Sequence, residues 1–162
     1  MATLKQDIKK QSDWIIKAFQ ADGFKLDYSI RSFIEIDRFF EKHSKNGKPV
    51  RGGRLTQNLG PIIFSIGSYI GETFIKNDKG AEWITDDNDP QGEITASIKF
   101  SNGMECWPMQ RVMKRFKNGF EDSVYTYGFE LAKEYTTETF DQSFWTINSS
   151  NNDKKSWWKF WQ

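Results

Sequence analysis

The feature that most constrains the fold is an apolar stretch from Leu59 to Lys79, which we predict to be a helix. Its apolar side chains cover most of the helix circumference, so it should be buried on several sides. At roughly 100° per residue, Gly60, Gly67 and Gly71 fall within about 40° of one another and leave a strip without side chains. Each glycine costs about 0.8–1 kcal/mol relative to alanine. We therefore expect a neighbouring element to pack very closely on this strip.

A narrow polar seam lies beside the glycines and ends at Glu72. Carboxylates are rarely buried unless they are paired, so Glu72 has two interpretations. In the functional interpretation, Glu72 lies in a cleft as an acid of raised pKa or as a carboxylate that anchors a ligand. In the structural interpretation, it is bonded to loop amides or to an arginine such as Arg111 or Arg115. The structural interpretation is favoured. The candidate binding residues of this region are Glu72, Ser68, Ser65, Tyr69, Trp83, Arg111 and Arg115.

The flanking segments predict an α+β fold of about five helices packed on a small three-stranded antiparallel meander. Helical periodicity runs over residues 4–21, 29–43 and 108–118, and a last long helix from Asp122 is expected to reach Phe140. Residues 82–85, 93–100 and 104–107 read as strands, with Ile94, Ala96, Ile98 and Phe100 alternating on one face of the second. We expect one domain over residues 1–141, followed by a polar linker and tail over residues 142–162.

Composition excludes several classes of protein. The 162 residues carry a net charge of +1, which provides no global field for nucleic acid. A single cysteine, Cys106, precludes an intramolecular disulfide and fits a reducing compartment. We see no apolar signal core at the N-terminus and no apolar run near the ~20 residues that span a bilayer. The expectation is a soluble, cytoplasmic protein of bacterial type.

Catalytic and metal-binding residues are hard to assemble from this chain. The lone histidine, His43, is predicted at the exposed end of a helix, where it favours the helix dipole. A dyad of His43 with Cys106 is formally possible, but nothing nearby suggests an activated thiol. The acidic stretch Asp86–Asp89 lacks the glycine and glutamate of a calcium loop, so a solvated turn is favoured. We predict no catalytic residue, no metal and no cofactor.

Two basic segments are candidate binding elements. Residues 48–54 place a Gly-Gly pair between arginines and could approach a phosphate, although a plain connector is favoured. Residues 109–117 combine an apolar stripe with four cations. The favoured interpretation is a helix whose apolar face packs on the core and whose basic face is exposed to solvent.

The C-terminus ends in a tail that holds three tryptophans and three lysines, with Trp157, Trp158 and Trp161 as candidate interaction residues. Tryptophan with lysine suits a membrane interface or a partner groove. Equally, the tail could fold back into a groove on its own domain. The sequence leaves both possibilities open.

The motif Gly67-Ser68-Tyr69-Ile70-Gly71-Glu72 is followed by Trp83 and then by Lys114-Arg115-Phe116-Lys117-Asn118-Gly119. This arrangement resembles the Gly-x-Tyr-x-Gly-Glu, Trp and Lys-Arg-x-x-Asn-Gly pattern of uncharacterised bacterial domains of unknown function. The likeness covers about two-thirds of the chain. It implies an α+β domain with the helix against a small sheet, and it implies no activity.

The resulting hypothesis is a non-catalytic protein-interaction module, with an immunity or inhibitor role as one specific version. Its expected partner is another protein, with membrane contact possible through the tail and no nucleic acid. The alternative is a small-molecule-binding domain or minor hydrolase with Glu72 in a cleft. That alternative needs a formed pocket reaching the Glu72 carboxylate.

Overall fold

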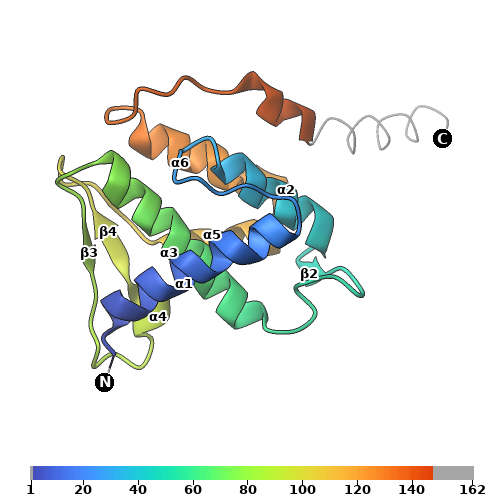
Figure 1. Cartoon of the computed structure of the whole chain (residues 1–162), viewed down its shortest axis with the longest axis horizontal. Coiled ribbons are helices and arrows are strands. Elements are labelled where there is room, and N and C mark those ends of the chain that lie inside the picture. The colour runs from blue at the N-terminus through green and yellow to red at the C-terminus, as the bar shows by residue number, and fades with distance from the viewer. Residues whose placement is uncertain (1, 148–162) are drawn as a thin grey trace.

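The computed structural model describes residues 2–147, which form six α-helices, two 3-10 helices and five short strands (Figure 1). The predicted α+β class is confirmed, with one helix more than expected. The elements in chain order are α1 (Leu4–Ala21), α2 (Phe33–His43), β1 (Ser44–Lys45), β2 (Lys48–Pro49), α3 (Leu59–Asn77), β3 (Glu82–Ile84), α4 (Gly92–Thr95), β4 (Ser97–Lys99), β5 (Glu105–Cys106), α5 (Pro108–Asn118), η1 (Gly119–Asp122), α6 (Val124–Ala132) and η2 (Gln142–Trp145).

Helix α3 lies at the centre of the molecule, as its all-round apolar pattern predicts. Its most extensive contacts are with α1 and α5, and Figure 1 shows α1 crossing it. The side chains of Ile66, Tyr69, Ile70 and Phe74 are almost fully buried. The prediction of a helix buried on several sides is confirmed.

The glycine strip of α3 is used for close packing at two of its three positions. A Cβ atom at Gly67 would lie 2.7 Å from Cγ of Met109, and one at Gly71 would lie 2.0 Å from Cζ2 of Trp83. Neither position has room for a side chain. Gly60 differs, because a Cβ there would meet nothing within 4 Å. The expectation of a closely packed neighbour is confirmed for Gly67 and Gly71 only.

The three-stranded sheet is the predicted antiparallel meander, with strand order β3-β4-β5. Trp83 pairs with Ile98, and Ile98 pairs with Cys106, so these three buried side chains share the inner face. Glu82, Lys99 and Glu105 lie opposite one another on the outer face. Cross-strand opposite charges of this kind are mildly stabilising.

The predicted strand over residues 93–100 is wrong in its first half. Residues Gly92–Thr95 form the short helix α4, and Ile94 is 38% exposed rather than buried. The Asp89 carboxylate accepts hydrogen bonds from the Gln91 amide and the Thr95 hydroxyl. An Asp side chain can accept hydrogen bonds from nearby backbone N–H groups that would otherwise pair with a neighbouring strand. These local bonds therefore favour a helical turn here instead of a strand.

The boundaries of α2 and α6 also differ from the prediction. Helix α2 begins at Phe33 rather than Ser29, and α6 ends at Ala132 rather than near Phe140. The chain then returns along α6, where the rings of Phe140 and Phe144 lie 4.8 and 5.2 Å from that of Tyr125. Phe144 is fully buried, so packing on the domain continues beyond residue 141.

A second, two-stranded sheet joins β1 to β2 and was not predicted. Asn46 and Gly47 both have positive φ, at 54° and 74°, which suits the two-residue turn of a tight hairpin. The loop that follows the hairpin places Gly53 and Arg54 against the ring of His43, which is 6% exposed. The prediction that His43 lies at an exposed helix end is therefore wrong.

Candidate functional site

Glu72 is held by a partner that sequence reasoning did not assign to it. The indole Nε1–H of Trp83 donates a hydrogen bond of 3.1 Å to Oε1 of Glu72, whose residue is 9% exposed. The indole reaches this position because Gly71, one residue earlier on α3, has no side chain. The seam beside the glycines is thus filled by Trp83 and offers no open space.

The other polar residues of the seam bond within the fold. The Ser68 hydroxyl donates to the Phe64 carbonyl, and the Ser65 hydroxyl lies 2.9 Å from both the Pro61 carbonyl and the side-chain oxygen of Gln11. The Tyr69 hydroxyl accepts from the Tyr28 amide and shares a hydrogen bond with Ser32. Burial raises the pKa of Tyr69 to about 12. Ser65 and Tyr69 thus link α3 to other segments, whereas Ser68 bonds within α3.

The two candidate arginines do not pair with Glu72. Nε of Arg115 lies 2.8 Å from the buried carboxylate of Asp37, and Nη2 lies 3.2 Å from Glu41. Arg111 lies 3.3 Å from Asp122, and its guanidinium stacks 3.8 Å from the Tyr127 ring centroid. The suggested arginine partner for Glu72 is therefore wrong.

Asp37 explains why Arg115 is buried. Its carboxylate also accepts the backbone N–H groups of Val124 and Tyr125, the first residues of α6. An anion at a helix N-terminus satisfies donors that the helix leaves free. Burial raises the pKa of Asp37, and the Arg115 guanidinium opposes that shift. The Asp37–Arg115 pair ties α2, α5 and α6 together.

Cys106 is also buried, and burial raises the pKa of its thiol to about 12. This environment disfavours the thiolate that a nucleophilic cysteine needs.

Within residues 2–147, no group of three His, Cys, Asp or Glu residues is placed to hold a metal ion. The described helices include none that is long and apolar enough to cross a membrane. Trp157, Trp158 and Trp161 lie outside the described residues.

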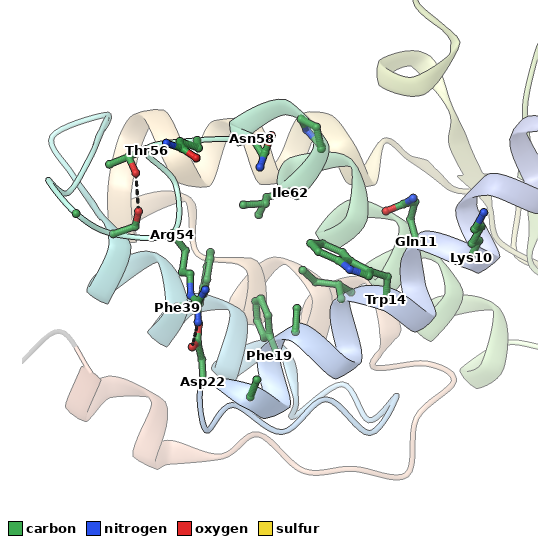
Figure 2. Close-up of a pocket in the computed structure, with 17 residues that line it drawn as sticks. Lys10, Gln11, Trp14, Phe19, Asp22, Phe39, Arg54, Thr56, Asn58 and Ile62 are labelled. Carbon is green, nitrogen blue, oxygen red and sulfur yellow. Dashed lines mark hydrogen bonds and ion pairs between the residues drawn. The ribbon is translucent and has the colours of Figure 1, made fainter.

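A cleft of about 800 Å³ lies between α1, α2, the start of α3 and the loop of residues 50–58. In Figure 2, Trp14, Phe19 and Ile62 surround the open space, and the Arg54–Asp22 ion pair lies at one side. Trp14 is 49% exposed despite its size. A cleft that combines apolar and aromatic side chains with polar groups has the composition of a binding site.

A second pocket of about 580 Å³ adjoins the cleft and shares Gln11 and Pro61 with it. Its lining comes from α1, α3, α4 and α5, and it consists of Asp7, Gln11, Gly60, Pro61, Ile63, Phe64, Glu93, Ile94, Met109 and Met113. We call the two pockets together the α1–α3 groove. Neither pocket is lined by Glu72.

The two pockets of the α1–α3 groove differ in the charges of their lining residues. The cleft end carries Lys10 and the Arg54–Asp22 pair, in which hydrogen bonds from Arg54 hold the pKa of Asp22 below its usual value. The α4–α5 end carries Asp7 and Glu93. Neither of these two carboxylates has an ion-pair partner in the part of the chain that the structure describes.

Sequence reasoning missed the groove, although one signal for it was present. The buried residues of α1 are Leu4, Ile8, Ile15 and Phe19, together with Ser12. At 100° per residue, Trp14 lies about 120° from the centre of that face. The 48–54 segment, interpreted as a plain connector, supplies part of the cleft wall.

No protein-family model, no curated protein and no solved structure matches this chain. The geometry of the α1–α3 groove is therefore what bears on the function of the protein.

Proposed function

We propose that this protein is a non-catalytic interaction module that binds a partner protein through the α1–α3 groove. The observation that carries the proposal is Trp14, a half-exposed indole beside a cleft of about 800 Å³. Tryptophan is enriched among the residues that dominate binding energy at interfaces. A large uncovered apolar ring at the mouth of a cleft is typical of an interaction site.

The proposed occupant is an amphipathic helix of the partner with basic residues at one end. Two pockets in succession suit the apolar side chains that one helix face presents at i, i+4 and i+7. Met109 and Met113 line the second pocket, and methionine adapts to varied apolar partners. The unpaired carboxylates of Asp7 and Glu93 favour lysines or arginines at that end of the partner helix.

The alternative of a small-molecule site or hydrolase at Glu72 requires a pocket that reaches its carboxylate. In this geometry Glu72 bonds to Trp83 and lines neither pocket. That alternative therefore draws no support from the site. Three statements made from the sequence stay predictions: the bacterial origin, the cytoplasmic location and the likeness to domains of unknown function.

The test selects binders from a displayed library of helices of about four turns, with the apolar face and the terminal charges randomised. We expect the selected peptides to carry aromatic or aliphatic residues on one face and basic residues at one end. Trp14→Gln should weaken their binding by at least about tenfold, as expected for a tryptophan hot spot.

Trp145→Gln is the matched control, because Trp145 is 52% exposed and lines neither pocket. It should leave the affinity unchanged. Glu93→Lys should weaken the basic peptides, whereas Glu121→Lys, an exposed position outside both pockets, should not. Selected peptides whose affinity is insensitive to Trp14 and Glu93, or a library without binders, would overturn the proposal.

A further inference from the structure

The wall of the cleft formed by residues 50–58 is attached to α2 through His43. The backbone N–H of Val50 donates to the His43 carbonyl at 2.8 Å, and the backbone N–H of Arg54 donates to the His43 ring at 3.2 Å. Gly53 lies against the same ring, because a Cβ atom there would be 3.1 Å from Nδ1. The Gly53 carbonyl in turn accepts from the Thr56 hydroxyl and amide. One imidazole thus anchors a chain of loop contacts.

The hydrogen bond from Arg54 specifies the protonation state of the ring. Nδ1 can accept it only when that nitrogen carries no proton, so the anchored form is the neutral imidazole with its proton on Nε2. Nε2 is buried and has no hydrogen-bond partner among the described residues. A proton added to Nδ1 would face the Arg54 N–H and remove the anchor.

We propose that His43 is a pH-sensitive latch on the α1–α3 groove, and that its protonation releases the 50–58 wall of the cleft. The ring is 4.7 Å from Phe39, which lines the cleft, so the latch lies directly behind the binding surface. Protonation would therefore alter the loop contacts and the cleft wall together.

The charged groups around the ring act in both directions. Lys42 on α2 and Arg54 on the loop oppose a positive charge on the ring, whereas Asp22 at the end of α1 favours it. Burial is the largest influence and lowers the pKa of His43 below its ordinary value of 6.5. The latch is accordingly closed at neutral pH and opens on acidification.

The wall opening is tested without any ligand by NMR on the full chain. His43 is the only histidine, so its ring signals are assigned without ambiguity. We expect a titration midpoint below 6.5, and we expect the amide signals of Gly53 and Arg54 to shift with the same midpoint. A midpoint at or above 6.5, or amide signals that do not follow the ring, would overturn the proposal.

His43→Asn supplies the matched variant, because Oδ1 of asparagine can replace Nδ1 as an acceptor and does not titrate. The Arg54 amide signal of this variant should be constant between pH 5 and pH 8. If the variant does not fold, the titration of the unmodified chain decides the matter alone. A folded variant whose Arg54 amide still titrates as in the unmodified chain would refute the latch.

The effect on binding rests on the proposed function and is measured separately, with the tightest peptide from the displayed library as the probe. If only the neutral form keeps the wall closed, its apparent affinity falls by up to about tenfold per pH unit below the midpoint. Tight binding that does not change with pH refutes the latch and leaves the proposed function intact. If the 50–58 wall opens on acidification but no peptide binds, the proposed function is refuted and the latch stands.

Discussion

Trp83 and Trp14 show two different uses of the same side chain next to α3. The Trp83 indole lies on Gly71 and donates to Glu72, so it fills the space that the glycine leaves. Trp14 packs into no such gap and lines the open cleft between α1 and the start of α3. A glycine strip with a polar seam therefore proved to be a packing device. The exposed indole of Trp14, which no polar sequence motif accompanies, marks the candidate site instead.

The difference has a physical origin. An indole buried with its N–H satisfied contributes both apolar area and a hydrogen bond to folding. An indole left in water contributes little to folding and keeps its apolar area for a partner. Mutations at the Trp83 region should therefore act on stability, and mutations at Trp14 should act on binding.

The largest effect is expected from Gly71→Ala, because the new methyl group would overlap the Trp83 indole. We expect the free energy of unfolding to fall by about 3 kcal/mol, as in overpacked cores, measured by urea denaturation. Gly60→Ala is the control in the same helix, where nothing lies within 4 Å. It should be neutral or stabilise by up to about 1 kcal/mol. Equal effects of the two substitutions would contradict the account of the glycine strip.

Glu72→Ala comes next, because it leaves the buried Nε1–H of Trp83 without an acceptor. We expect a loss of about 2 kcal/mol in unfolding free energy and no change in peptide binding. Glu72→Gln retains an oxygen acceptor and should cost less. An unchanged thermal melt of Glu72→Ala would revive the interpretation of Glu72 as a ligand-anchoring acid.

A smaller effect is expected from pH, acting through His43. Its pKa is lower in the folded state than in the unfolded state, so the unfolded chain binds the proton more tightly. Stability contributed by His43 is then complete above the unfolded pKa and is lost as pH falls through the lower folded value. Urea denaturation at a series of pH values should show this loss. The curve of His43→Asn should be flatter, and parallel curves would argue against the assignment.

The smallest change in stability is expected from Trp14→Gln, within about 0.5 kcal/mol of the unmodified chain. Glutamine is a good helix former and the lost contacts are half exposed. Thermal unfolding of this variant beside Trp145→Gln provides the measurement. A loss above about 2 kcal/mol would mean that Trp14 belongs to the core, and the contrast with Trp83 would disappear.

Much of the fold could be predicted because its signals are local. The periodicity of α1 gives its bounds to the residue, and the strands predicted to end at Phe100 and to begin at Met104 pair with each other as β4 and β5. The strand predicted over residues 93–100 failed because apolar alternation over a few residues is also compatible with a turn of helix. There the side-chain bonds of Asp89 decided the outcome.

The candidate site could be predicted only in part, because contacts between distant residues have no local signal. The prediction that Ser65, Ser68 and Tyr69 lie on one buried helix with Glu72 is confirmed, but the partner expected for Glu72 was a loop amide or an arginine rather than an indole. Arg115 was already committed to Asp37, which also caps α6. Those pairings depend on how three helices meet.

From the amino-acid sequence it follows that α3 is central, that Gly67 and Gly71 accept close neighbours, and that a small antiparallel sheet comes after α3. These follow from periodicity and the absence of Cβ atoms, which are properties of short segments. Tertiary structure alone decided that Trp83 fills the seam, that His43 is buried under the loop, and that Trp14 remains uncovered. The reason is that burial is settled by which surfaces meet in space, and those surfaces are far apart in the chain.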